Sequence, residues 1–129
     1  MDINLNQDEL TKLSALGIKA LILFGSQSQG LANEKSDYDF FIIGPKTNET
    51  YDFIYDMLSP KIKKLTNIDI VFEVDAPMEL KYHVIKYGKI IYEKDENVFL
   101  DFKEKIMTIY QDFAPHRKMF QQATFERIT

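Results

Sequence analysis

The chain is 129 residues long, has a mass of 15.1 kDa and contains no cysteine. This is the size of one domain, and the absence of cysteine excludes disulfides, thiolate nucleophiles and cysteine-bound zinc or iron–sulfur sites. The composition, 45% hydrophobic and 28% charged, argues for an ordinary globular domain and against disordered, collagen-like or repeat architectures. With a net charge of −4, a basic face built for duplex nucleic acid is not expected.

Neither a membrane span nor a signal peptide is indicated. The longest apolar run, Ala20 to Phe24, is far shorter than the roughly 18 residues of a spanning helix, and the first six residues have neither a basic region nor an apolar core. We therefore expect an unprocessed cytoplasmic protein that makes no membrane contact. The charge is uneven, since residues 1–60 carry 9 acidic and 4 basic side chains and residues 61–129 carry 11 and 12.

Hydrophobic periodicity predicts the first elements of the fold. Asn6 and Glu9 have the spacing of a capping box and begin a helix that should end at Gly17. The almost continuous apolar run over residues 18–24 predicts a strand buried on both faces, and residues 38–43 predict a second strand.

The second half of the chain continues the alternation. A helix capped by Asn48 or Thr50 should follow, then a third strand over residues 68–74 and a helix that begins near Asp75. Residues 89–92 predict a short edge strand. Beyond it, apolar residues at steps of three and four predict a long helix that Pro115 interrupts, and a final helix after it. This pattern predicts an α/β core capped by C-terminal helices.

The first chemical signal is Gly25-Ser26, directly after the buried strand. A strand that ends in Gly-Ser and opens a short helix presents free backbone N–H groups at a positive helix end, which suits an anion such as phosphate. Ser26 adds a hydroxyl donor. Alone, Gly-Ser after a strand is more often only a turn.

Asp37 and Asp39 are the second signal. In a strand, residues i and i+2 lie on one face, so two carboxylates here repel each other next to an apolar strand unless a cation relieves them, and Mg²⁺ is the natural choice. The alternative is that Asp37 belongs to a turn and Asp39 faces solvent. Asp69 lies inside the third apolar strand and would complete a three-carboxylate site if the two strands are neighbours. Glu73 and Asp75 are rivals for this third place, although Asp75 is better interpreted as a helix N-cap.

Gly25-Ser26, ten residues, then Asp37-x-Asp39 and an apolar strand resemble the signature of the DNA polymerase beta-type nucleotidyltransferase superfamily, in particular its minimal members. The resemblance implies that fold: a small mixed sheet flanked by helices, with a C-terminal helical extension. It implies ATP as substrate and two Mg²⁺ ions. The residues that it assigns to catalysis and metal binding are Asp37, Asp39 and Asp69, and those that it assigns to the nucleotide are Gly25, Ser26 and Ser36.

Later segments resemble the MntA-type antitoxins, the nucleotidyltransferase partners of HEPN-domain toxins. They are Ala76-Pro77, residues 87–95 and the long helix that runs through residues 110–115. The resemblance implies one domain over residues 1–129, with a core of about 1–93 and helices over about 95–128. It also implies a hetero-oligomer with a HEPN-type RNase, which the protein silences by transferring AMP from ATP to a tyrosine hydroxyl of that toxin.

The loop after Gly25-Ser26 departs from the family. Family members often carry an alanine and an arginine before the second glycine, where this chain has Ser28 and Gln29. The missing positive charge would weaken triphosphate binding or shift it to Lys35 or to a partner. The loop departure leaves open a relative that inhibits the toxin by binding alone. A nucleotidyltransferase that modifies a small molecule is a separate alternative. His83 is expected to be a helix-surface or packing residue rather than a ligand.

Overall fold

The structure is a computed structural model that describes residues 3–25, 38–62 and 67–112. In these ranges the elements follow in the order α1 (Gln7–Ala15), β1 (Ala20–Phe24), β2 (Tyr38–Ile43), α2 (Asn48–Leu58), β3 (Ile68–Phe72), α3 (Met78–Tyr87), β4 (Lys89–Glu93) and α4 (Val98–Asp112). Short 3-10 turns, Ser59–Lys61 and Glu73–Asp75, follow α2 and β3. The predicted alternation of strands and helices is confirmed. The helix expected after Pro115 lies outside the described residues.

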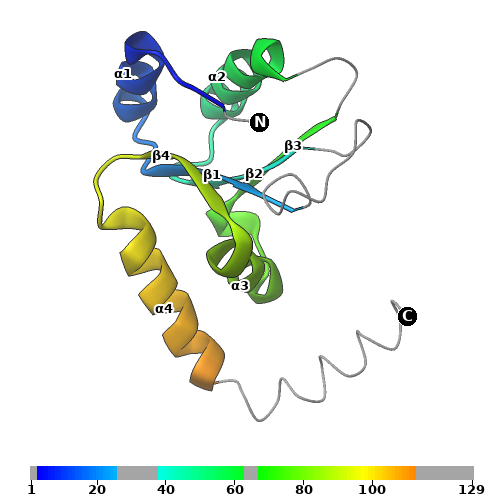
Figure 1. The fold of residues 1–129 in the computed structure, drawn as a ribbon, viewed down its shortest axis with the longest axis vertical. Helices are drawn as coiled ribbons and strands as arrows, with labels where there is room; N and C mark the ends of the chain where they lie inside the picture. The colour runs from blue at the N-terminus through cyan, green and yellow to red at the C-terminus, as the bar shows by residue number, and fades with distance from the viewer. Residues whose placement is uncertain (1–2, 26–37, 63–66, 113–129) are drawn as a thin grey trace.

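The strands form a mixed sheet in the order β3-β2-β1-β4. β1 is antiparallel to both β2 and β4, whereas β2 and β3 are parallel to each other and are joined through α2. In this sheet β4 lies at an edge, as the sequence predicts. The C-terminal end of β1 and the N-terminal ends of β2 and β3 therefore meet at one end of the sheet (Figure 1).

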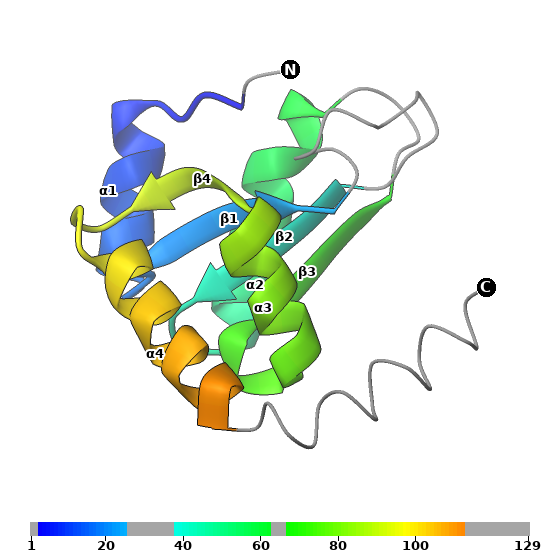
Figure 2. The same cartoon turned by 60° about the horizontal axis from the view of Figure 1, so that its bottom comes forward.

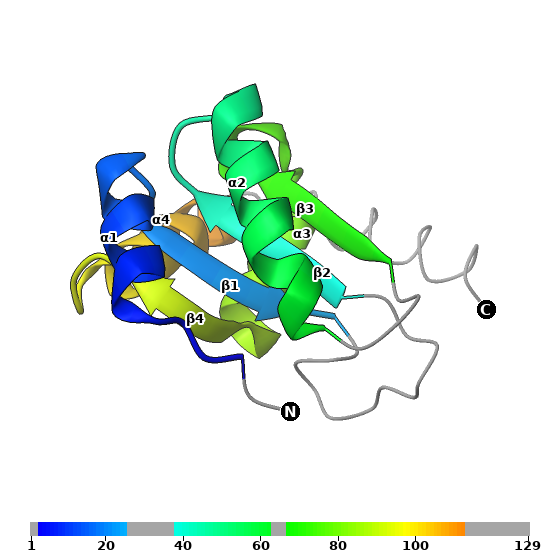
Figure 3. The ribbon, with the colours of Figure 1, turned by 90° about the horizontal axis from the view of Figure 1, so that it is seen from above.

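Helices cover both faces of the sheet. α1 and α2 lie on one face, and α3 and α4 lie on the other (Figures 1 and 3). Side chains alternate between the faces along each strand. On β2, Phe40 and Ile42 belong to the core under α1 and α2, whereas Phe41 and Ile43 belong to the core under α3 and α4. All five residues of β1 are buried, which confirms the strand predicted to be covered on both sides.

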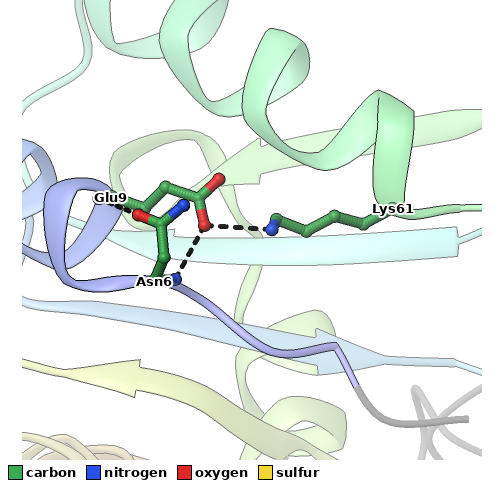
Figure 4. Close-up of polar contacts among 3 residues, drawn as sticks. All are labelled: Asn6, Glu9 and Lys61. Carbon is green, nitrogen blue, oxygen red and sulfur yellow. Dashed lines mark hydrogen bonds and ion pairs between the residues drawn. The ribbon is translucent and has the colours of Figure 1, made fainter.

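The start of α1 is the predicted capping box (Figure 4). The Glu9 N–H donates to Asn6 Oδ1 at 2.8 Å, and the Asn6 N–H donates to Glu9 Oε1 at 2.9 Å. Lys61 Nζ, from the turn after α2, lies 2.9 Å from the same Glu9 oxygen. Burial alone would raise the pKa of Glu9, but the Asn6 hydrogen bond and the Lys61 ammonium hold it below its ordinary value. One carboxylate thus caps α1 and ties it to α2.

Two boundaries in the first half of the chain differ from the predictions. β1 begins at Ala20 rather than Ile18, because the Ile18 N–H donates back to the Leu13 carbonyl at 3.0 Å and closes the end of α1 over Gly17. α2 is capped by Thr47, so the prediction of Asn48 or Thr50 is wrong. The Thr47 hydroxyl oxygen accepts from the Thr50 N–H at 3.0 Å.

α3 and α4 pack against each other and against the sheet. The rings of Tyr82 on α3 and Tyr110 on α4 stack with centroids 4.0 Å apart, and Phe102 of α4 lies 5.4 Å from Phe41 of β2. These contacts hold α4 beside α3 in both Figures 1 and 2. No helix within the described ranges has the length and apolarity needed to cross a bilayer.

Candidate active site

The site begins at Gly25, the residue directly after β1. Its φ is +78°, a conformation that glycine adopts at little cost. A Cβ placed on Gly25 would lie 2.5 Å from Oδ2 of Asp39, too close for any real side chain. Glycine at this position therefore allows the Asp39 carboxylate to lie directly against the backbone at the end of β1.

Asp39 and Asp69 are brought side by side by the sheet. They are paired in the parallel register between β2 and β3, so both side chains lie on the same face, the one covered by α3 and α4. Asp39 is half-buried and Asp69 is exposed. The condition that the sequence left open, that the strands of these two aspartates are neighbours, is met.

The other members of the predicted site lie outside the described residues. They are Ser26, Ser36 and Asp37. Among the residues that the structure describes, no three carboxylates or histidines gather closely enough to hold a metal ion. Asp37 would be the third carboxylate of the predicted set.

The two rivals for the third place do not lie on β3. The strand ends at Phe72 rather than at Val74, and Glu73 and Asp75 fall in the 3-10 turn that follows it. Asp75 forms an ion pair with Lys46 at 2.6 Å, and Glu73 lies 4.0 Å from Lys105. The interpretation of Asp75 as an N-cap is also wrong, because Pro77 occupies that position and α3 has no side-chain cap.

The carboxylates that are described suit a hard divalent cation. Asp39 and Asp69 supply oxygen ligands from adjacent strands, and Gly25 leaves the Asp39 carboxylate room at the end of β1. Oxygen-only donor sets of this kind favour Mg²⁺ over softer metals. These residues therefore fit the predicted ion, with Asp37 as the expected third ligand.

His83, expected from the sequence to be a helix-surface or packing residue, is half-buried on α3 and packs near the site. Its ring meets the ring of Phe24 edge-on, with centroids 6.3 Å apart, and Phe24 is paired with Asp39 across β1 and β2. Burial lowers the pKa of His83 below its ordinary value. The one sequence feature that relates His83 to Tyr87 is their i, i+4 spacing on α3. In the structure their rings lie 5.0 Å apart.

The comparisons with known proteins all point to the same family. The model of the "Polymerase beta, Nucleotidyltransferase" family matches residues 9–97, a range that contains Gly25, Asp39 and Asp69. The chain is similar to protein adenylyltransferase MntA of Aphanizomenon flos-aquae (strain 2012/KM1/D3). The two are 29% identical over 108 residues, and the match covers 76% of this chain and 71% of that protein.

Solved structures share the fold. A chain from a crystal structure of a toxin–antitoxin with AMP-PNP matches with a TM-score of 0.70 and 22% identity, over 94% of this chain and 99% of the other. A chain from the complex of tri-AMPylated Shewanella oneidensis HEPN toxin with MNT antitoxin matches with a TM-score of 0.59 and 20% identity, over 92% and 98%. The expected fold, a small mixed sheet flanked by helices, is thereby confirmed. This chain belongs to the polymerase beta nucleotidyltransferase family.

Proposed function

We propose that the protein is an antitoxin that transfers AMP from ATP to a tyrosine of a HEPN-domain RNase toxin. One observation carries the proposal: Asp39 and Asp69 lie in register on one face of the sheet, with Gly25 against the Asp39 carboxylate. Support for the partner comes from the relatives, which include a protein adenylyltransferase and an antitoxin in complex with an AMPylated HEPN toxin.

The residues divide the chemistry between them. Gly25 and Ser26, with Ser36, would bind the nucleotide phosphates through backbone N–H groups and hydroxyls. Asp39 and Asp69, together with Asp37, would hold Mg²⁺, which when bound neutralises phosphate charge and orients the reacting groups. Asp69 is exposed on the edge strand β3, from where it would accept the proton of the acceptor hydroxyl.

The reaction balances with no further reactant. The acceptor oxygen forms a bond to the α-phosphorus, and the bond between that phosphorus and the oxygen bridging to the β-phosphate breaks. Pyrophosphate leaves with the electron pair, and the hydroxyl proton goes to Asp69. The protein contributes mainly position and charge neutralisation, as in other phosphoryl transfers.

The test is to mix the purified protein with MgATP and the product of the neighbouring gene, and to weigh that product by mass spectrometry. A mass gain of one or more AMP units is expected. A stable complex without mass gain would instead favour an antitoxin that acts by binding. If the product neither gains mass nor forms a stable complex, a small-molecule nucleotidyltransferase is favoured.

Asp39→Asn sharpens this test. Replacing the carboxylate by an amide is expected to lower AMP transfer by about 10³-fold, since charge stabilisation of this kind contributes several kcal/mol. The matched control is Asp52→Asn, the same chemical change at an exposed position of α2 on the other face of the sheet. Equal transfer by Asp39→Asn and wild type, followed with ATP labelled at the α-phosphate, would refute the assigned site.

A further inference from the structure

Three rings form a row that leads from the core to the surface. The Phe24 ring meets the His83 ring at 6.3 Å, and the His83 ring meets the Tyr87 ring at 5.0 Å. Phe24 is 7% exposed, His83 is half-buried and Tyr87 is 42% exposed. The inner end of the row is therefore packed in the core, whereas its outer end offers an aromatic surface to solvent.

The row begins at the carboxylate end of the sheet. Phe24 precedes Gly25 and is paired with Asp39, and residues paired in this way have side chains on the same face. The end of α3 lies directly on β1, because a Cβ on Gly88 would come within 2.7 Å of Ile22 Cγ2. Figure 2 shows this end of α3 over β1. His83 and Tyr87 thus border the face from which Asp39 and Asp69 project.

The row has the chemistry of a base-binding surface. Burial lowers the pKa of His83, so its imidazole is uncharged at neutral pH and offers one donor and one acceptor nitrogen. Lys86 Nζ lies 5.3 Å from the centroid of the Tyr87 ring and adds positive charge at the outer end. Aromatic side chains bind nucleobases by stacking without regard to which base is present.

We propose that His83 and Tyr87 contact the nucleobase of the bound nucleotide. The inference rests on the proposed function, which places the reacting phosphate at Asp39 and Asp69. A single ribose joins the base to the α-phosphate, so the base lies one sugar away from these carboxylates. The row starts at Phe24, which is paired with Asp39, and ends at the exposed ring of Tyr87, so it offers aromatic surface beside the carboxylates for a nucleoside. An acceptor side chain is the other possible occupant, and the experiment separates the two.

The test compares two ligands that share their phosphates. Binding of MgATP and of magnesium tripolyphosphate is measured by calorimetry for wild type, Tyr87→Ala and His83→Ala. Tyr87→Ala is expected to weaken MgATP binding about tenfold, the size of one lost stacking contact, and to leave tripolyphosphate binding unchanged. Tyr87→Phe keeps the ring and should bind MgATP as wild type does.

Tyr51→Ala is the matched control. Tyr51 is 40% exposed, stacks on a neighbouring tyrosine of α2 and lies on the other side of the sheet, so its loss should change neither affinity. Unchanged MgATP binding in Tyr87→Ala and His83→Ala, with melting temperatures retained, would overturn the proposal. Equal losses of affinity for both ligands would also overturn the proposal. A raised KM for the acceptor protein with unchanged MgATP binding would overturn it as well, and would assign the rings to the acceptor. If wild type binds no MgATP, the proposed function fails and this inference fails with it.

Discussion

The two faces of the sheet use the same strands but differ at the end where the strands meet. On the face under α1 and α2, Tyr38 is 7% exposed and continues the apolar core to the start of β2. The next residue, Asp39, faces α3 and α4. It is charged rather than apolar and lies beside Asp69. Strand alternation thus lets one face carry the charges of the candidate site while the other remains a packed core.

Removing one ring from each face tests whether both cores contribute equally to stability. Phe40 and Phe41 are fully buried neighbours on β2 that point to opposite faces. Replacement of either by alanine is expected to lower the free energy of unfolding by about 3–5 kcal/mol, because a large cavity opens. Urea denaturation measures both losses.

Leucine at the same positions separates stability from activity. Phe→Leu roughly keeps the core volume and should cost about 1 kcal/mol on either face. Phe41 lies two residues from Asp39 on the same face, so Phe41→Leu should also lower AMP transfer, whereas Phe40→Leu should not. Loss of transfer in a stable Phe40→Leu protein would contradict the division between the faces.

Two glycines with the same backbone conformation form the next pair. Gly25 has a φ of +78° and Gly17 a φ of +79°, so alanine should cost about 1–2 kcal/mol of stability at each. A Cβ on Gly17 would meet Pro45 Cγ at an ordinary 3.4 Å, whereas on Gly25 it would displace the Asp39 carboxylate. Gly25→Ala alone is therefore expected to reduce AMP transfer, by about 100-fold, as displaced catalytic groups do.

The measurements for this pair are melting temperature and transfer of labelled AMP. Equal stability losses with a selective loss of transfer in Gly25→Ala would support the close approach of Gly25 and Asp39. Equal transfer in both variants would mean that the Asp39 carboxylate tolerates displacement, and the site would then have to be assigned elsewhere.

The sequence correctly predicted the features that depend only on residues close together in the chain. The capping box at Asn6 and Glu9 is such a case, because a cap depends on residues three positions apart. The bounds of β2 are another, since an apolar run ends at a Gly-Pro pair. The cap of α2 was misplaced because Thr47, Asn48 and Thr50 all have cap chemistry. Burial of Thr50, a tertiary effect, selects Thr47.

The candidate site was only partly predictable, because its parts come from distant segments. The sequence indicated Asp39 by its spacing from Asp37 and Asp69 by its place inside an apolar strand, but their pairing depends on the order of the strands in the sheet. The contact of His83 with Phe24 was not predictable. It arises because Gly88 allows the end of α3 to lie directly on β1. The sequence of α3 alone does not show how closely the helix approaches the strand.

The smallest predicted effect concerns the face without the site. The pKa of Glu9 is lower in the folded protein than its ordinary value of 4.5, so the folded state binds fewer protons there than the unfolded chain. The stability from this carboxylate is therefore complete above about pH 4.5 and is lost as the pH falls through the folded pKa. Glu9→Gln keeps a capping side chain but cannot ionise.

At pH 7 the Glu9→Gln protein is expected to be less stable than wild type by up to about 1 kcal/mol, the range of ion pairs at a protein surface, for the half-buried pair with Lys61. As the pH falls through the folded pKa of Glu9, the two urea curves should converge, because wild type is then protonated as well. An offset that does not change with pH would exclude a charge effect. Since α1 lies under the face without the carboxylates, AMP transfer by Glu9→Gln should equal that of wild type, and any loss would show that the two faces are coupled through the sheet.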